Sequence, residues 1–471
     1  MASVDPDIRA LRARFEEFDQ GHVLRFWDRL SPEARQQLAT QAASLDLPAL
    51  LRGFRASQQV AHEVPKLGAP EVEALPEFGG SAPRRDEARA RGEALLREGR
   101  VALMVVAGGQ GSRLGFPGPK GLYPLGPVTG RTLFALQAQR IRRLRERTGA
   151  AIPWYVMTSE ATDAATRSAF AEAGHFGLPA RDVFFLCQGM ITSFDVDGKL
   201  ILERPDRIFV NPDGHGGSLT ALLASGALDD MERRGITTIF YYQVDNPMIE
   251  IGDPVLLGFH AQAGAQASCK SLRKREPAEK MGVFARIDGR IGVVEYTEIT
   301  PEQRDARDRS GRLLFDAGNL AVHAFEVEFV REIAAEAERW LPWHASAKKI
   351  PTIDASGAPV EPSEPNGLKL ERFVFDALRA AETVCIVEAA RDEYGPVKNA
   401  SGSDSPQSSR EALSAHYRRW IEAAGLRAPS PAHQIEIDET RIGGPDDLRA
   451  LGLTAIEHAR DSIHTRLGDD A

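Results

Sequence analysis

The stretch Leu103–Gly121, LMVVAGGQGSRLGFPGPKG, joins an apolar run to a glycine-rich loop. The run Leu103–Val106 predicts a buried strand, and the loop after it carries two cations, Arg113 and Lys120. Glycine lets a backbone turn sharply and lets a ligand approach closely, while exposed N–H groups in such a loop form an anion-binding concavity. The stretch therefore predicts a site for a nucleoside triphosphate at the carboxyl end of a strand.

Two common phosphate-binding patterns do not fit this loop. A dinucleotide fingerprint, G-x-G-x-x-G, that starts at Gly109 would need glycine where Leu114 stands. A P-loop needs Ser or Thr after its lysine, whereas Lys120 is followed by Gly121. The broken fingerprint argues against a NAD-binding oxidoreductase, and an ordinary strand-to-helix turn is the alternative to phosphate binding.

The composition of the chain limits its class. At 471 residues it is long enough for two or three domains, and its net charge is −9. An acidic chain lacks the basic surface needed to coat a nucleic acid, so we expect no nucleic-acid partner. Three dispersed cysteines, a charged N-terminus and the lack of any uncharged apolar run of membrane-spanning length predict a cytoplasmic protein without a membrane partner.

Residues 1–99 carry no recognisable chemistry and are predicted to form an N-terminal helical region. Ile8–Phe18 places apolar residues at helical spacing, and Arg85–Arg97 also looks helical. Between them, Ser31 and Pro32 form a good N-cap and first-turn pair for another helix.

Residues 100–400 alternate strands with helices and are predicted to form one domain, which contains the first glycine-rich loop. This alternation predicts an α/β fold with a mixed, mostly parallel central sheet. Its strongest strand, Thr238–Val244, runs straight into Asp245. An acidic residue at the carboxyl tip of a central strand suits a divalent cation or a ribose, with capping of the following turn as the alternative.

Three further segments of this domain carry specific predictions. Thr132–Arg147 predicts an amphipathic helix whose basic outer face we expect to be solvated. Asn211–Leu219, NPDGHGGSL, is a second glycine-rich loop, where the backbone should approach something closely. Gly282–Ile299 predicts a hairpin about a D-G turn, with Glu295 on its returning strand.

Residues 401–471 are predicted to form a small C-terminal lobe. It begins with Ser401–Ser409, a polar, turn-rich stretch that predicts a mobile loop or a domain boundary. A helix over Glu411–Ala424, a strand over Gln434–Ile437 and a helix near Ile456–Arg466 follow.

The order of motifs resembles that of the eukaryotic-type UDP-N-acetylhexosamine pyrophosphorylases, within the wider family of UDP-sugar pyrophosphorylases. The matching segments are HVLRFW, AGGQGSRLGFPGPKGLY, MTSEAT, QGM, NPDGHGG, VDNPM, GFHAQAGA, MGVF, VVEYTEI, AGNLAVH, KKIP, PNGLKLERFVFD and RDEYGPVKNASGSDSP. They cover about residues 10–412, while the C-terminal lobe matches only loosely. The resemblance implies the nucleotide-diphospho-sugar transferase fold (GT-A-like, Rossmann-like) and a uridylyltransferase that forms a UDP-sugar and pyrophosphate from UTP and a sugar-1-phosphate.

Carried over position by position, the resemblance also implies roles for residues of this chain. The UTP base would be held by Ala107, Gly108, Gly109, Gln110, Gln188 and Gly214. The phosphates would be contacted by Arg113, Lys120 and Lys398, and Mg²⁺ would be bound by Asp245. The sugar would be contacted by His215, Gly282, Glu295, Asn319, Phe373 and Phe375. Judged by position alone, Lys398 is a surface lysine beside a turn and the two phenylalanines are core residues.

The implied reaction suits these residues. A sugar-1-phosphate oxygen attacks the α-phosphorus of UTP, and pyrophosphate leaves. A phosphate nucleophile is already ionised at neutral pH, so catalysis needs positioning and charge neutralisation rather than a general base. No nucleophile-elbow or H-E-x-x-H motif is recognisable, which is consistent with direct in-line transfer.

One residue departs from the family pattern. The N-acetylhexosamine enzymes typically read P-D-G-N-G-G in the second glycine-rich loop, whereas this chain has His215 in place of Asn. The UDP-glucose and broad UDP-sugar pyrophosphorylases carry Gly-His-Gly there. The resemblance therefore implies N-acetylglucosamine-1-phosphate as substrate, with a UDP-glucose or broad-specificity UDP-sugar pyrophosphorylase as the alternative. A sugar-nucleotide-binding protein without catalysis is the alternative of another class, and both a monomer and a dimer are compatible with the sequence.

Overall fold

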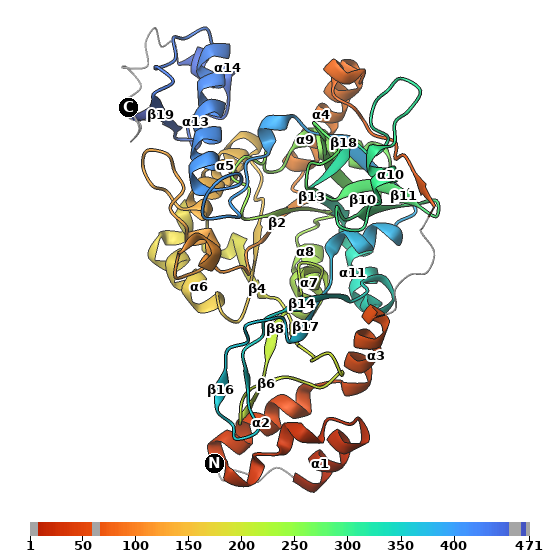
Figure 1. Cartoon of the computed structure of the whole chain (residues 1–471). Coiled ribbons are helices and arrows are strands. Elements are labelled where there is room, and N and C mark those ends of the chain that lie inside the picture. The colour runs from red at the N-terminus through yellow and green to blue at the C-terminus, as the bar shows by residue number, and fades with distance from the viewer. Residues whose placement is uncertain (1–7, 59–65, 452–462, 468–471) are drawn as a thin grey trace. The chain divides into compact units, whose positions relative to one another are not determined.

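The chain forms two compact units, each assembled from segments that are far apart in the sequence (Figure 1). The computed structural model describes residues 8–58, 66–451 and 463–467. Unit 1 comprises Met1–Val64, Gln188–Thr220 and Glu336–Ala377. Unit 2 comprises Pro65–Cys187, Ala221–Ala335 and Leu378–Ala471. The three-part division expected from the sequence, at residues 99 and 400, stays a prediction.

Four parallel strands form the centre of unit 2. They lie side by side in the order β9 (Thr238–Gln243), β2 (Val101–Val106), β3 (Trp154–Thr158) and β4 (Val183–Cys187). Almost every residue of β9, β2 and β3 is buried, as expected for parallel strands that are covered on both faces. These strands confirm the apolar runs that the sequence predicted as strands.

Antiparallel strands extend this sheet beyond β9. They are β1 (Leu67–Gly68), β10 (Ala267–Arg273), β11 (Val283–Ile287), β12 (Arg290–Val294) and β13 (Ala317–Glu326), and β10 also pairs in parallel with β18 (Val384–Glu388). In the described residues the sheet has ten strands, which confirms the predicted mixed α/β fold. The predicted hairpin is β11–β12, and its turn residues Asp288 and Gly289 both have positive φ, 50° and 90°.

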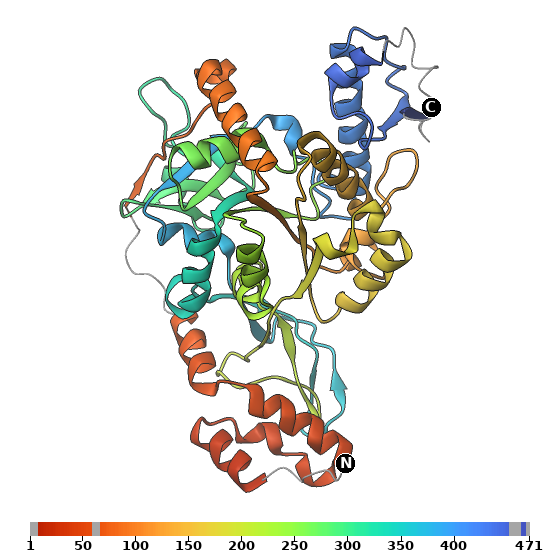
Figure 2. The ribbon, with the colours of Figure 1, turned by 180° about the vertical axis from the view of Figure 1, so that it is seen from behind.

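Helices pack around this sheet. The helices of unit 2 are α4 (Ala82–Arg97), α5 (Leu133–Thr148), α6 (Asp163–Glu172), α8 (Ala227–Arg233), α9 (Pro254–Gln262), α10 (Pro301–Asp305) and α11 (Val327–Ala335), and α7 (Gly217–Ala224) runs from unit 1 into unit 2. Helices α4 and α9 cross closely, as both ribbon views show (Figure 2). A Cβ at Gly92 would lie 1.9 Å from the Pro254 oxygen, and one at Gly258 would lie 1.7 Å from the Ala88 oxygen. Glycine is therefore required at both crossing points.

Unit 1 combines helices with short two-stranded sheets. The helices are α1 (Ile8–Glu17), α2 (Pro32–Ser44), α3 (Leu47–Gln58) and the short α12 (Ala337–Trp340). The paired strands are β5 (Met190–Thr192) with β8 (Val210–Pro212), β6 (Leu202–Arg204) with β7 (Arg207–Ile208), β14 (His344–Lys348) with β17 (Gly367–Glu371), and β15 (Thr352–Ile353) with β16 (Pro359–Val360). As predicted, Ser31 caps α2, and its side chain accepts the N–H of Ala34. Aromatic residues such as Phe15, Trp27 and Phe194 fill the core of this unit.

The C-terminal part of unit 2 corrects two sequence predictions. It contains α13 (Pro406–Ala423), β19 (His433–Ile437), α14 (Pro445–Ala450) and β20 (Ile463–Leu467). Helix α13 begins inside the stretch Ser401–Ser409 that was predicted as a loop, because Ser405 and Ser408 form a reciprocal capping box. Of the helix predicted near Ile456–Arg466, residues 456–462 lie outside the described ranges, and the rest is a strand paired with β19.

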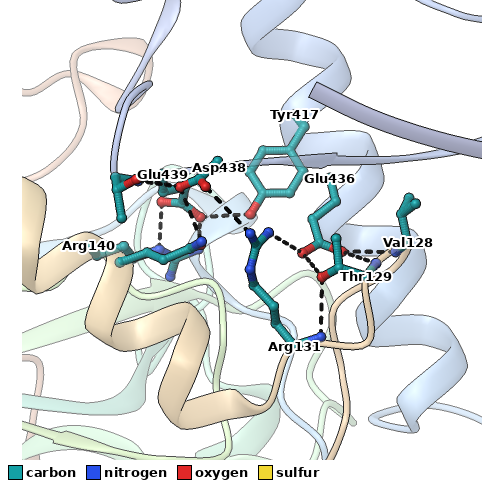
Figure 3. A network of polar contacts seen from close by, with 10 residues as sticks. Val128, Thr129, Arg131, Arg140, Tyr417, Glu436, Asp438 and Glu439 are labelled. Atoms are coloured by element: carbon teal, nitrogen blue, oxygen red, sulfur yellow. Dashed lines mark hydrogen bonds and ion pairs between the residues drawn. The ribbon is translucent and has the colours of Figure 1, made fainter. Parts of the chain in front are cut away.

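The basic face of α5 is solvated only in part: Arg142 and Arg147 are exposed as predicted, whereas other arginines form ion pairs. Arg140 binds the Glu439 carboxylate with both Nε and Nη2, each at 2.7 Å (Figure 3). Arg143 pairs with Asp447. Just before the helix, Arg131 pairs with Glu436 at 3.1 Å (Figure 3). The acidic partners come from about 300 residues later in the chain, so the local charge pattern could not reveal them. None of the helices in the described ranges has the length and apolar character needed to cross a membrane.

Candidate functional site

The first glycine-rich loop folds back on itself after β2. The Gly111 N–H donates to the Gly118 oxygen at 2.8 Å, and the Lys120 N–H donates to the Gly109 oxygen at 3.0 Å. A Cβ built at Gly109 would find no heavy atom within 4 Å, so this side of the backbone is open. The Gly108 oxygen accepts the Ser159 hydroxyl at 2.7 Å, which ties the loop to the end of β3. The loop thus keeps a fixed shape and leaves room beside Gly109, as a nucleotide site requires.

Two of the three predicted cations lie close to Asp245. Asp245 lies two residues after the end of β9, because the strand ends at Gln243 and not at Val244 as predicted, and its Oδ2 atom lies 3.8 Å from Nζ of Lys120. Burial alone would lower the pKa of Lys398, but the neighbouring groups Asp245, Tyr394 and Asp404 outweigh it and hold that pKa above its ordinary value. Lys398 therefore stays protonated beside Asp245. The third cation, Arg113, is exposed in the short helix η4 (Ser112–Leu114).

Asn246 holds the segment that carries Lys398 against the tip of β9. Its side-chain Nδ2 donates to the Glu393 oxygen at 2.9 Å, and its Oδ1 accepts the N–H of Gly395 at 3.2 Å. The Val397 N–H adds a 2.8 Å bond to the backbone oxygen of Asp245. Sequence reasoning gave Asn246 no role, although its place in the VDNPM motif was the available signal.

A buried ionic cluster lies behind this segment. Nζ of Lys270 lies 2.7 Å from Oδ2 of Asp253 and also contacts the Glu393 carboxylate. Burial would lower the pKa of Lys270, but Asp253, Glu393 and Glu250 hold it above its ordinary value. Within the described ranges, Glu250, Asp253 and Glu393 form the one carboxylate group compact enough for a metal ion. Because Lys270 forms ion pairs with two of these carboxylates, Asp253 and Glu393, we assign this cluster a structural role.

Three predicted sugar contacts of unit 2 come together. The Asn319 N–H donates to the Gly282 oxygen at 2.8 Å, and Oε1 of Glu295 lies 3.0 Å from where a Cβ of Gly282 would be. Glu295 follows β12 instead of lying on it, because that strand ends at Val294. The side-chain Oδ1 of Asn319 accepts the Ala321 N–H at 2.9 Å, which fixes the orientation of the amide. Gly282, the Glu295 carboxylate and the oriented Asn319 amide thus lie close together.

The other predicted contacts, Gln188, Gly214, His215, Phe373 and Phe375, belong to unit 1. Gly214 has φ of +88°, and a Cβ there would lie 2.5 Å from the Arg372 oxygen. The close approach predicted for the second glycine-rich loop is therefore an approach to the chain's own backbone.

His215 forms an aromatic cluster with the two phenylalanines. Its Nδ1 accepts the Val374 N–H at 3.1 Å, and its ring centroid lies 5.3 Å from that of Phe373 and 5.7 Å from that of Phe375. Burial lowers the pKa of His215 to about 4, so the ring is neutral at pH 7. With Nδ1 accepting, the proton of the neutral ring is on Nε2. Phe375 itself is buried, in keeping with the core alternative that the sequence left open.

Comparison with known proteins identifies a consistent set of relatives. A family model described as UTP--glucose-1-phosphate uridylyltransferase (UDPGP) matches residues 64–433. The chain is 40% identical over 435 residues to human UDP-N-acetylhexosamine pyrophosphorylase-like protein 1, covering 88% of this chain and 86% of the relative. It is 36% identical over 478 residues to UDP-N-acetylglucosamine diphosphorylase 2 of Arabidopsis thaliana, covering 96% and 93%. The crystal structure of the uridine diphosphate N-acetylglucosamine pyrophosphorylase from Trypanosoma brucei in complex with inhibitor is similar with a TM-score of 0.78 and 29% identity, covering 90% of this chain and 87% of that one.

Proposed function

The chain belongs to the UDPGP family of uridylyltransferases, and we propose that it forms UDP-N-acetylglucosamine and pyrophosphate from UTP and N-acetylglucosamine-1-phosphate. The observation that carries the proposal is the charge arrangement at the tip of β9, where Asp245 lies beside Lys120 and near the charge of Lys398. A protein that only bound a sugar nucleotide would have no need to gather these groups around a leaving pyrophosphate.

Charge neutralisation is the main task in this reaction. The bond that forms joins a phosphate oxygen of the sugar-1-phosphate to the α-phosphorus of UTP, and the bond that breaks releases pyrophosphate. Both reactants are anions and repel each other. The ammonium groups of Lys120 and Lys398 reduce this repulsion and stabilise the negative charge that develops on the leaving pyrophosphate. We assign Arg113 to the phosphates as well, because it extends from the same loop as Lys120. Since the nucleophile is already ionised, no side chain has to remove a proton.

The residues at Asp245 also fit a magnesium ion. Mg²⁺ in nucleotide-binding sites is commonly held by one or two carboxylates together with phosphate oxygens of the substrate. Asp245 offers a largely buried carboxylate at the end of a central strand, with its Lys120 partner 3.8 Å away rather than in tight contact. Bound there, Mg²⁺ would neutralise phosphate charge and help to orient the triphosphate.

An N-acetylated sugar is the proposed substrate. We assign the hydroxyl groups of the sugar to Gly282, Glu295 and Asn319, which lie together in unit 2. The contact of Phe373 and Phe375 with the N-acetyl group stays a prediction of the family resemblance. The names of the relatives described above, which refer to N-acetylhexosamine or N-acetylglucosamine, support the proposed substrate.

His215 is the observation that favours a UDP-glucose or broad-specificity enzyme instead. In unit 1, however, Nδ1 of His215 accepts the Val374 N–H, and its ring lies against Phe373. The histidine therefore has a structural reason to be there that is independent of the sugar. We keep N-acetylglucosamine-1-phosphate as the first choice for this reason.

Product analysis tests the proposal. The purified chain is incubated with UTP, N-acetylglucosamine-1-phosphate and MgCl₂, and nucleotide sugars are separated by anion-exchange chromatography. We expect UDP-N-acetylglucosamine and pyrophosphate in equal amounts, and loss of both when EDTA is added. Folded protein that yields neither product with any sugar-1-phosphate would overturn the proposal. A cytoplasmic location and a monomeric or dimeric state stay predictions.

A further inference from the structure

The Asp213 carboxylate is buried between two glycines in unit 1. A Cβ at Gly189 would lie 2.6 Å from its Oδ2, and a Cβ at Gly217 would lie 2.0 Å from its Oδ1. The backbone of the same residue is held on both sides, because its N–H donates to the Gly189 oxygen at 3.1 Å and its oxygen accepts the Arg372 N–H at 2.8 Å. The carboxylate is therefore fixed in place and needs glycine at both neighbouring positions.

This carboxylate faces the side chain of Gln188. Both side chains are buried, with 7% of each residue exposed. Nε2 of Gln188 donates to Oδ1 of Asp213 at 3.5 Å. A carboxylate can only accept hydrogen bonds, so it attracts the NH₂ end of the amide and repels the oxygen end. The Oε1 atom of Gln188 is consequently directed away from Asp213 and is available as an acceptor.

We propose that Asp213 fixes the orientation of the Gln188 amide and thereby makes the nucleotide site select uracil over cytosine. The inference rests on the proposed function and on the contact of the Gln188 side chain with the base that the family resemblance predicts. Uracil carries an N–H donor at N3, which the Gln188 oxygen can accept. Cytosine has an unprotonated acceptor at N3, which the same oxygen repels. A polar group held in one orientation therefore discriminates between bases of nearly the same shape.

The charge on Asp213, on which this selection depends, is opposed by burial and favoured by Arg372. The Arg372 side chain is buried, with its guanidinium carbon 4.0 Å from the centre of the Trp343 ring. Burial raises the pKa of Asp213 to about 7, whereas the charge of Arg372 and the N–H of Gln188 act in the opposite direction. Above neutral pH the carboxylate is therefore anionic, so the assays below are made at pH 8.5.

The test compares UTP with CTP as the nucleotide substrate at a fixed, saturating sugar-1-phosphate concentration. In Asp213→Asn the new amide can donate as well as accept, so Gln188 is no longer held in one orientation. We expect the ratio of kcat/KM for UTP to kcat/KM for CTP to fall at least about tenfold, because the variant loses a hydrogen bond to a charged group. We also expect kcat/KM for CTP itself to increase. A merely loosened fold would lower both values alike.

A second variant should displace the same carboxylate without removing its charge. Gly189 does not have a positive φ, so Gly189→Ala is compatible with the backbone, but its methyl group would push against Oδ2 of Asp213. We expect it also to lower the UTP-to-CTP ratio. Asp354→Asn is the matched control, because Asp354 caps its own turn in unit 1 through Ser356 and Ala358 and should leave the ratio unchanged.

The outcomes separate this inference from the proposed function. If the unmodified chain converts UTP and both variants lose UTP and CTP turnover in equal proportion, Asp213 does not set base selection and the inference is wrong. If the unmodified, folded chain converts neither nucleotide with any sugar-1-phosphate, the proposed function itself fails. A reduced ratio in Asp213→Asn and in Gly189→Ala, with an unchanged ratio in Asp354→Asn, supports the inference.

Discussion

Oδ2 of Asp245 lies 3.8 Å from Nζ of Lys120, which places a cation of the first glycine-rich loop beside the acidic tip of the central strand. The aspartate lies just after strand β9, and the lysine lies in the loop after the neighbouring strand β2. Because the two strands are parallel, their carboxyl ends meet at the same edge of the sheet. The pairing thus follows from the sheet topology, and it defines where triphosphate and metal would meet.

Asp245→Asn should remove the proposed magnesium site while keeping the shape of the turn. We expect kcat/KM to fall about a hundredfold or more, because an amide oxygen is a weaker magnesium ligand than a carboxylate. We also expect half-maximal activity to need a higher Mg²⁺ concentration, which a titration of initial rate against MgCl₂ measures. Asp229→Asn, at an exposed aspartate of α8, is the control. An unchanged rate and titration curve in Asp245→Asn would show that the metal assignment is wrong.

Lys398→Ala should mainly affect the chemical step. The ammonium group is held near Asp245 and is proposed to neutralise charge that develops as pyrophosphate leaves. Removal of one such group typically lowers kcat about 10²- to 10³-fold. Initial-rate kinetics should therefore show a large drop in kcat and a smaller change in KM for UTP. Lys66→Ala, at an exposed lysine, serves as the control; equal loss of kcat and of UTP affinity in Lys398→Ala would instead indicate a purely binding role.

His215 should make the stability of the chain depend on pH below neutrality. Its pKa is about 4 in the folded protein and 6.5 ordinarily, so the unfolded state takes up a proton first as the pH falls. The free energy of unfolding should then decrease from pH 6.5 to pH 4 by up to about 3 kcal/mol from this residue. His215→Asn lacks that titration. Urea denaturation at pH 7 and pH 4.5 should show a smaller loss in the variant, and an identical loss in both proteins would contradict the neutral, buried ring.

Glu439 should be important for the stability of unit 2. It accepts two hydrogen bonds from Arg140 and one from the Tyr417 hydroxyl, each at 2.7 Å (Figure 3). Glu439→Ala would leave the Arg140 charge buried without its partner, which typically costs about 3 kcal/mol or more. Thermal denaturation should show a clearly lower Tm. Asp446→Ala removes an exposed carboxylate that pairs with Arg449 and should have no measurable effect, so equal shifts in the two variants would argue against the buried pair.

Much of the fold and the position of Asp245 could be predicted from the sequence because their signals are local. An apolar run followed by a loop identifies strand β2, and the run Thr238–Val244 identifies β9 and the aspartate at its end. The D-G turn likewise identifies the hairpin β11–β12. The side-chain assignments came from motif order rather than from periodicity, and those without a structural test stay predictions.

Long-range pairings could not be predicted from local patterns. The arginines of α5 have the spacing of a solvated face. Some of them instead pair with acidic residues around Glu439, which are distant from α5 in the sequence. The contact of His215 with Phe373 depends in the same way on two separate segments of unit 1. Strand β20 was predicted as part of a helix because its pairing with β19 is a tertiary interaction that the local pattern does not encode.

Direct competition between two sugars tests the central claim most directly. Equal concentrations of N-acetylglucosamine-1-phosphate and glucose-1-phosphate are mixed with limiting UTP and MgCl₂, and the two nucleotide sugars are quantified at low conversion. The product ratio gives the ratio of the kcat/KM values for the two sugars in one tube. We predict that UDP-N-acetylglucosamine is the dominant product. A product that is mainly UDP-glucose would contradict the account and identify the chain as a UDP-glucose pyrophosphorylase.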